Sequence, residues 1–383
     1  MGSEEVIGVR STGVRFPVRR PGLLAAAAAL ALALAGCGQA AQSGGAADAP
    51  PPEEDDRVTI GLLLPDSHTA RWEAFDRPLM EKKIAELCHD CSVEYANAQG
   101  DVATQRQQVD TMITKGVDVM ILDPVDHKSL RSSVKHAAEA GIPVVSYDRL
   151  ADGPISAYVS FDGDDVGRLQ GEALLKAMGD KADGGRIVMM NGDPSDPNAA
   201  WFRDGALSVL KDRVKVEKEY DTPRWSPENA HLNMNGAIAA LGPDAIDGVY
   251  SANDALASGI ISSLKAGNVK RLPPVTGQDA ELTAVQRIVE GEQPMTVYKP
   301  FKPEAEAAAA MAVALGHGES AGDITRDRIS TPTAKDVPAV LLKPLVVTVD
   351  NIKDTVVKDG MYTIDQICTE KFLAACEKAG LVT

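Results

Sequence analysis

Carboxylate, guanidinium and amide side chains recur in this sequence close behind short apolar runs, together with its three tryptophans. They are Arg71, Trp72, Asp148, Arg149, Asp196, Asn198, Trp201, Trp225, Asn253, Gln278 and Asp279. Carboxylates accept hydrogen bonds, guanidiniums donate them and amides do both, so such planar groups engage neighbouring hydroxyl groups in pairs. The C–H faces of a pyranose ring suit an indole plane. The set therefore favours monosaccharide binding, with core packing as the alternative interpretation for each tryptophan.

The apolar runs predict the elements that position these side chains. A first series covers 58–64, 93–96, 117–122 and 143–147, and a second covers 186–190, 214–216, 245–250 and 274–276. Amphipathic stretches separate them, with helices expected to begin near Pro197, Pro227, Asp254 and Glu281. Near-continuous apolar strands between such helices indicate parallel sheets covered on both faces. We expect an α/β fold of two doubly wound lobes, with ligand bound beyond the carboxyl ends of the strands.

Two other interpretations apply to the same side chains. Asp and Asn cap helices routinely, so a cap is the alternative for each of them taken singly, although Arg71 and Arg149 cannot cap an N-terminus. Asp148 with Asp196, or Asp196 with Asp279, could also form the acid–base pair of a glycosidase. Arginine and lysine in the same cleft would keep these carboxylates ionised, which argues against an enzyme.

The N-terminal segment predicts export and lipidation. Four arginines, the last of them Arg20, precede a run of only Leu and Ala at 23–35. This order of charged, apolar and small residues is typical of a secretory signal, here 1–36. Leu34-Ala35-Gly36-Cys37 resembles a bacterial lipobox, in which the cysteine is lipidated; an ordinary signal followed by an incidental cysteine is the alternative.

Composition then bounds the rest of the chain. Residues 37–56 hold small residues, prolines and an acidic run, which predicts a disordered tether. The formal charge of −16 argues against nucleic acid as a partner. We expect a protein held at the outer face of the cell membrane by Cys37 alone. ATP and NAD are scarce there, so no cofactor is expected.

The four remaining cysteines form two local pairs, Cys88 with Cys91 and Cys368 with Cys376. Even numbers of cysteines in local pairs favour disulfides in an exported protein. A metal site at Cys88-His89-Asp90-Cys91 is the alternative, but no second ligand motif accompanies it, so no metal is predicted.

Seven short segments carry a family resemblance. They are A-R-W (70–72), Y-D-R (147–149), S-F-D (160–162), D-P-N-A (196–199), N-D-A (253–255), G-Q-D-A (277–280) and V-Y-K-P (297–300). In order and spacing they resemble type I periplasmic sugar-binding proteins, the solute-binding lipoproteins of ABC importers. The D-xylose-binding members are the most similar, followed by multi-sugar binding proteins. The chain departs from the xylose pattern at Pro197, where an Asn is usual, and in its C-terminal cysteines.

The resemblance implies the fold and the roles of individual residues. The lobes would be 57–161 with 299–348, and 162–298 with 349–383, joined by a three-strand hinge that closes on ligand. Trp72 and Trp225 would stack on the sugar, and its hydrogen bonds would come from Arg71, Asp148, Arg149, Asp196, Asn198, Asn253, Asp279 and Lys299. A monomer that delivers D-xylose to an ABC permease is expected. A galactose, glucose or arabinose binder that presents its closed form to a sensor kinase or chemoreceptor is the alternative.

Overall fold

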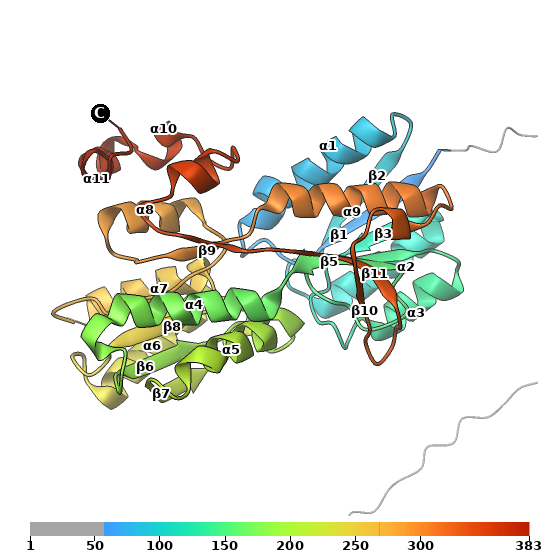
Figure 1. Ribbon diagram of the computed structural model, residues 1–383. Helices are drawn as coiled ribbons and strands as arrows, with labels where there is room; N and C mark the ends of the chain where they lie inside the picture. The colour runs from blue at the N-terminus through green and yellow to red at the C-terminus, as the bar shows by residue number, and fades with distance from the viewer. Residues whose placement is uncertain (1–56, 268, 383) are drawn as a thin grey trace, which may run out of the picture. The chain divides into compact units, whose positions relative to one another are not determined.

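The computed structural model describes residues 57–267 and 269–382, which belong to one unit of the chain, Asp55–Thr383. The signal peptide, Cys37 and the tether that the sequence predicts lie outside the described residues. Strands and helices alternate along most of the described part, and most strand pairs are parallel (Figure 1). The fold is α/β, as predicted.

Seven strands form the larger sheet. In spatial order they are β10 (Asp327–Ile329), β11 (Val337–Leu342), β5 (Ala157–Phe161), β4 (Val144–Tyr147), β3 (Val119–Leu122), β1 (Thr59–Leu64) and β2 (Ser92–Asn97). Only β10 pairs antiparallel with its neighbour in this sheet. The β3 and β4 strands are buried along their whole length, which explains their continuous apolar sequence.

Helices cover both faces of the larger sheet. The π-helical turn η1 (Trp72–Asp76), α1 (Arg77–Leu87) and α9 (Phe301–Gly316) pack on the face that carries Ile60 and Leu62. On the opposite face, α2 (Val102–Lys115) and α3 (Arg131–Glu139) contact Leu63 and its neighbours. Successive side chains of β1 thus enter different halves of the core, as the two-residue repeat of a strand requires.

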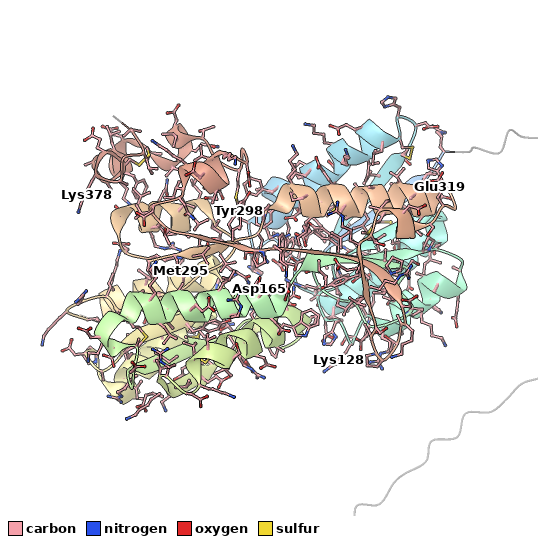
Figure 2. The ribbon with its side chains drawn as sticks, in the orientation of Figure 1. Lys128, Asp165, Met295, Tyr298, Glu319 and Lys378 are labelled. Atoms are coloured by element: carbon pink, nitrogen blue, oxygen red, sulfur yellow. A yellow bond between two sulfur atoms is a disulfide. The ribbon has the colours of Figure 1, made fainter. Side chains whose placement is uncertain are left out.

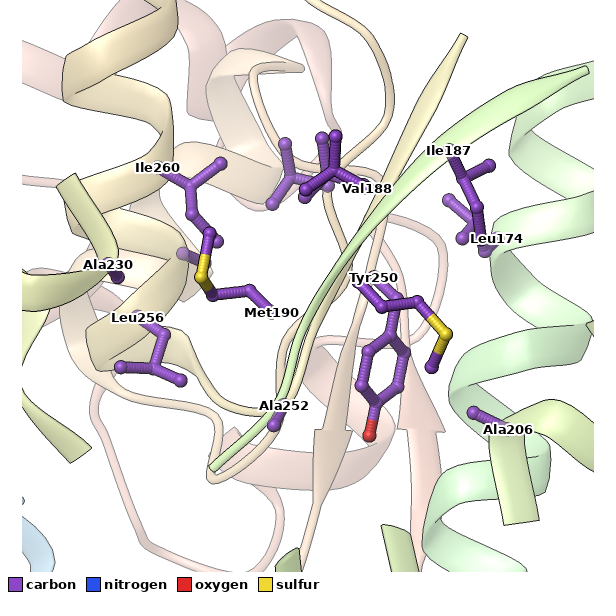
Figure 3. Packing of buried hydrophobic residues seen from close by; sticks show 14 of the residues in the cluster. Leu174, Ile187, Val188, Met190, Ala206, Ala230, Tyr250, Ala252, Leu256 and Ile260 are labelled. Atoms are coloured by element: carbon purple, nitrogen blue, oxygen red, sulfur yellow. The ribbon is translucent and has the colours of Figure 1, made fainter. Parts of the chain in front are cut away.

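The smaller sheet has the order β7 (Lys215–Tyr220), β6 (Arg186–Met190) and β8 (Gly248–Ser251), and all its strand pairs are parallel. Its helices are α4 (Gly163–Met178), α5 (Pro197–Leu210), α6 (Pro227–Leu241) and α7 (Asp254–Ala266). In Figure 3, Ile187 points toward Leu174 of α4, whereas Met190 points toward Ile260 of α7. The strands therefore form the middle layer between two helical layers.

The helices α4 and α5 approach each other more closely than side chains would allow. A Cβ atom on Gly167 would lie 1.9 Å from the carbonyl oxygen of Phe202, and one on Gly205 would lie 2.2 Å from that of Asp164. Only glycine fits at these two positions, and the two backbones touch directly.

The chain passes between the two sheets at three places. After β5 of the larger sheet it enters α4, which packs on the smaller sheet. It returns through α8 (Leu282–Glu290) and β9 (Thr296–Tyr298) into α9. From β11 it passes to β12 (Leu345–Val347), which pairs antiparallel with β9. Figure 2 labels Met295 and Tyr298 in the connecting segment between α8 and α9.

The C-terminal segment packs against α8. It contains the π-helical turn η5 (Lys353–Val357) and two short helices, α10 (Ile364–Ile367) and α11 (Leu373–Lys378). A disulfide between Cys368 and Cys376 ties the two helices together.

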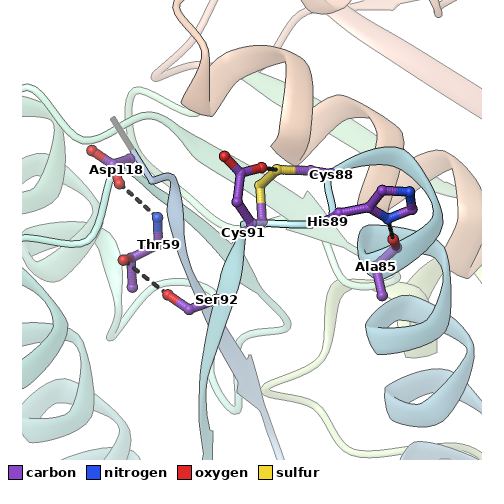
Figure 4. The surroundings of a disulfide bond; sticks show 8 residues. Thr59, Ala85, Cys88, His89, Cys91, Ser92 and Asp118 are labelled. Carbon is purple, nitrogen blue, oxygen red and sulfur yellow. Dashed lines mark hydrogen bonds between the residues drawn. A yellow bond between two sulfur atoms is a disulfide. The ribbon is translucent and has the colours of Figure 1, made fainter. Parts of the chain in front are cut away.

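A second disulfide, Cys88–Cys91, closes the turn between α1 and β2. Figure 4 shows its surroundings, where the His89 ring lies 2.8 Å from the Ala85 carbonyl oxygen and Thr59 N donates to Asp118.

The predicted strand 274–276 is wrong. In the structure these residues form only an isolated parallel bridge, between Val249 and Val275. Pro273 and Pro274 explain the difference, because proline has no N–H to donate to a strand ladder. The predicted helix starts at Pro197, Pro227 and Asp254 agree with the structure, and Glu281 is the N-cap of α8.

Candidate functional site

One polar cavity collects side chains from the carboxyl ends of both sheets. It encloses about 290 Å³ of empty space, including the part open to solvent. All ten predicted ligand-binding residues line it: Arg71, Trp72, Asp148, Arg149, Asp196, Asn198, Trp225, Asn253, Asp279 and Lys299. Thr69, Phe202 and Gln278 complete the lining. The structure thus brings together residues that are up to 228 positions apart, from Arg71 to Lys299.

Strand ends and helix starts place these side chains. Asp148 and Arg149 directly follow β4, and Lys299 directly follows β9. Asp196 is the N-cap of α5, and Asn253 is the N-cap of α7. Their Oδ1 atoms accept the hydrogen bonds of the cap, from Asn198 N and Leu256 N. These two residues are therefore helix caps and cavity residues at once, so the two sequence interpretations do not exclude each other.

Three residues of the cavity have an unusual backbone. Asp148 has a φ of 50°, Trp225 a φ of 50° and Asp279 a φ of 88°. Positive φ costs free energy in residues with a side chain, and such residues cluster at functional sites. Here the conformation turns three side chains into the same cavity.

Two contacts across the cavity link the larger sheet to the smaller one. Arg149 Nε lies 2.8 Å from Asp196 Oδ2 in an ion pair. Asn198 Nδ2 donates to Asp148 Oδ1 over 2.9 Å. Both contacts are buried, which strengthens their electrostatic attraction relative to a surface pair.

Arg71 is held on every side. Its Nε and Nη2 donate to both carboxylate oxygens of Asp76, Nη2 also donates to Glu304 Oε2 over 2.6 Å, and Nη1 donates to Asp148 Oδ2 over 2.8 Å. The guanidinium carbon lies 4.3 Å from the ring centre of Trp72 and 4.1 Å from that of Phe301. Burial lowers the pKa of Arg71, but the surrounding carboxylates outweigh it and raise the pKa well above its ordinary value. Arg71 is a fixed cation.

Lys299 supplies the third cation of the cavity. Its Nζ lies 3.0 Å from Asp279 Oδ1 and 3.7 Å from Asp148 Oδ2. Burial lowers the pKa of Lys299, but Asp279 and Asp148 together raise it by more, so the net shift is upward. The three cations face three aspartates in the lining, and the cavity wall is formally neutral.

The pKa values of two aspartates in the wall shift in opposite directions. Burial raises the pKa of Asp148, but Lys299, Arg71 and Arg149 lower it by more, so it falls below its ordinary value. Burial raises the pKa of Asp196 to about 6, even though Arg149 opposes the shift. At neutral pH both side chains are mainly carboxylates.

Two indoles line the cavity and the third does not. Trp225 Nε1 donates to Asp196 Oδ2 over 3.1 Å, and its ring lies against Gly192, where a Cβ atom would come within 2.0 Å of it. Trp72 Nε1 is buried and has no hydrogen-bond partner among the described residues. Trp201 does not line the cavity; it is half-buried and lies close to Gly163 of α4.

Buried acids behind the cavity escaped the sequence analysis. Asp66 and Asp123 face Arg149 at 3.5 and 3.6 Å, while Asp76 and Glu304 hold Arg71. Asp66 and Asp123 follow β1 and β3 closely, so the strand-end rule that found Asp148 could have found them. Nothing in the sequence marks Glu304, which lies 233 residues from Arg71.

Pro197, the departure from the xylose pattern, does not line the cavity. It occupies the first position of α5, where a backbone N–H would have no helical partner and where proline is favoured. Proline therefore suits the helix start, and its side chain is not part of the cavity wall.

Cys88, Cys91 and His317 bring potential metal-ligand atoms within 4.8 Å of one another. Both sulfur atoms are engaged in the disulfide, so this group does not form a metal site in the structure. Within the described part of the chain, no helix combines the length and apolar character that a bilayer span needs.

A family model described as a periplasmic binding protein domain matches residues 60–320. The chain belongs to the periplasmic binding proteins. A D-xylose-binding periplasmic protein of Escherichia coli (strain K12) is 40% identical over 311 residues, which cover 80% of this chain and 91% of that protein. A multiple sugar-binding periplasmic receptor of Rhizobium radiobacter is 33% identical over 332 residues, covering 82% and 93%.

A solved structure agrees with this membership. The ABC transporter solute-binding protein from Clostridium phytofermentans with bound β-D-glucose has a TM-score of 0.74 and 30% identity, covering 81% of this chain and 99% of its own. The predicted type I periplasmic binding protein fold is confirmed. Membership makes the chain an extracytoplasmic binding protein of solute transport and not an enzyme, so the glycosidase alternative does not hold.

Proposed function

We propose that this periplasmic binding protein captures a monosaccharide in the polar cavity and delivers it to the permease of an ABC importer. D-xylose is the favoured ligand. The observation that carries the proposal is the cavity wall, in which three cations and three aspartates balance one another beside two indoles. Such a wall hydrogen-bonds a neutral polyol well and offers no net charge to a charged solute.

The ten residues would divide the work. Arg71, Asp148, Arg149, Asp196, Asn198, Asn253, Asp279 and Lys299 would hydrogen-bond the sugar hydroxyls, and Trp72 and Trp225 would lie against its two faces. Two buried polar atoms of the wall without a hydrogen-bond partner among the described residues also favour a hydroxylated ligand, because Trp72 Nε1 can donate and Gln278 Oε1 can accept. A sugar hydroxyl can satisfy either atom.

Closure of two lobes would trap the sugar. The lobes are 57–161 with 299–348, and 162–298 with 349–383, and they would rotate about the three connecting segments. Arg71, Asp148 and Arg149 belong to the first lobe, whereas Asp196, Asn198, Asn253 and Asp279 belong to the second. A ligand that touches both sets favours the closed form. The monomeric protein would stay at the membrane through lipidated Cys37.

The sugar itself follows from similarity. The E. coli relative is named for D-xylose and is 40% identical, which favours D-xylose. The Rhizobium radiobacter relative is named as a multiple sugar-binding receptor. A binder of galactose, glucose or arabinose that presents its closed form to a sensor kinase or chemoreceptor is therefore the second candidate.

Isothermal titration with a panel of pentoses and hexoses tests the proposal. We expect D-xylose to bind with a dissociation constant of about 1 μM or lower, corresponding to about −8 kcal/mol. Intrinsic fluorescence should change with it, because two of the three tryptophans line the cavity. Equal affinity for glucose or galactose would favour the second candidate, and a panel without any binding would refute sugar capture.

A further inference from the structure

A second cavity adjoins the polar one, and its character is different. It encloses about 640 Å³ of empty space, including the part open to solvent. It lies between the η1 segment, the start of α8 and the C-terminal segment after η5. Its aromatic residues form a cluster in which Phe75 lies 5.7 Å from Phe301 and 5.8 Å from Tyr362, measured between ring centres. Ala74, Leu282 and Met361 extend the apolar wall.

The two cavities share part of their walls. Thr69, Arg71 and Asp279 line both of them. The guanidinium of Arg71 contacts both the ring of Trp72 in the polar cavity and the ring of Phe301 in the apolar cavity. A group attached to a sugar at the edge near Thr69 and Asp279 would therefore point toward the aromatic cluster.

The chemistry of the second cavity excludes most charged groups. Apart from the shared Arg71 and Asp279, the only ionisable carboxyl in its wall is Glu281. Burial raises the pKa of Glu281 to about 8, with Asp254 and Asp279 adding to the shift, so this carboxyl is mainly neutral at pH 7. A space of this size with aromatic walls and few polar groups is typical of sites for small apolar ligands.

From these walls we infer that the second cavity is a subsite for an apolar, aromatic substituent on the bound sugar. The ligand class would then include aryl glycosides, with the sugar ring in the polar cavity and the aglycone against Phe75, Phe301 and Tyr362. This inference rests on the proposed sugar binding and extends its ligand class from free monosaccharides to substituted ones.

Calorimetry with matched ligands tests the subsite. D-xylose, the methyl D-xylosides and the phenyl D-xylosides, each as both anomers, are titrated into the purified protein. We expect one phenyl xyloside to bind at least as tightly as D-xylose, because ring burial in the second cavity adds favourable free energy. Leu282→Gln, which alters only the second cavity, should weaken that phenyl xyloside about threefold to tenfold and leave D-xylose within about twofold.

The controls separate this inference from the proposed function. Leu87→Gln makes the same change at an exposed site that lines neither cavity, and it should alter no affinity. If D-xylose binds and neither phenyl xyloside does, the subsite is refuted while sugar capture stands. Equal losses for D-xylose and phenyl xyloside in Leu282→Gln, or no loss for either, also refute it. If no sugar binds at all, the proposed function fails first.

Discussion

Arg149 and Asp196 form an ion pair of 2.8 Å although they follow strands of two different sheets. A hydrogen bond lies beside it, which Asn198 of α5 donates to Asp148. Asp148 is adjacent to Arg149 and Asn198 lies two residues after Asp196, so the two contacts link the sheets at neighbouring points. Both links form where the proposed sugar would lie, so closure and ligand capture depend on the same side chains.

The first prediction concerns this ion pair. Asp196→Asn removes the carboxylate at 2.8 Å from Arg149 and leaves the more distant Asp66 and Asp123, and weakening a buried pair is costly. We expect the affinity for D-xylose to fall by about 2 kcal/mol or more, which is about thirtyfold. Asp204→Asn on the exposed side of the same helix is the matched control in the titration. Unchanged affinity in Asp196→Asn would remove the pair from the binding mechanism.

The second prediction concerns Glu304, which touches Arg71 at 2.6 Å but does not line the cavity. Glu304→Gln keeps the size of the side chain and replaces the carboxyl group that accepts from Arg71 Nη2 with an amide. We expect a loss of sugar affinity of about tenfold. Glu306→Gln, two residues further on and more exposed, should have no effect.

A double-mutant cycle shows whether Glu304 acts through Arg71. In an Arg71→Met background, Glu304→Gln should cause little further loss of affinity, because the partner that it positions is gone. Additive losses would mean that Glu304 supports the fold in another way.

The third prediction concerns pH and stability. Burial raises the pKa of Glu281 to about 8, with Asp254 and Asp279 adding to the shift, Arg287 opposing it and Tyr362 close by. The folded protein therefore keeps this proton at pH values where the unfolded chain has lost it, and stability falls as the pH rises toward 8. Glu281→Gln removes the effect. In urea unfolding, the free energy of unfolding of the variant relative to that of the wild type should rise by at least about 1.4 kcal/mol between pH 5 and pH 9.

Parallel stability curves for the two proteins would contradict the raised pKa of Glu281. Glu290→Gln provides the control, since this residue ends the same helix and is exposed. Its curve should follow the wild type throughout the pH range.

The fourth prediction concerns Cys37, which lies outside the described residues. Cys37→Ser removes the thiol that lipidation would use, so the protein should move from the membrane fraction to the soluble fraction. The released protein should bind D-xylose with wild-type affinity, because no cavity residue changes. Continued membrane attachment of the variant would refute the lipid anchor.

The sequence predicted the cavity wall well because parallel sheets bring strand ends to one edge. Asp148 and Arg149 directly follow β4 and lie where that rule expects them. Lys299 follows β9, which pairs antiparallel with β12, and it was expected only from the family resemblance. Helical phase explains the errors around α5. Asn198 and Phe202 are four residues apart and face the cavity together, whereas Trp201 turns toward α4.

Of the acids behind the wall, Glu304 was beyond the reach of the sequence. Glu304 meets Arg71 only because α9 packs beside η1, and no spacing in the chain records that contact. The second cavity has the same origin, since Phe75, Phe301 and Tyr362 come from three distant segments. Local patterns predict which face of an element is apolar, but not which faces meet.

The direct backbone contact between α4 and α5 has a mechanical consequence. Only Asp162 separates the end of β5 in the larger sheet from the start of α4. The N-cap of α5 is Asp196, and Asn198 lies in its first turn. With no side chains between them at Gly167 and Gly205, there is no compressible layer to absorb a rotation. We expect α4 and α5 to move as one rigid body, so that a rotation of the backbone near Asp162 displaces Asp196 and Asn198 as well.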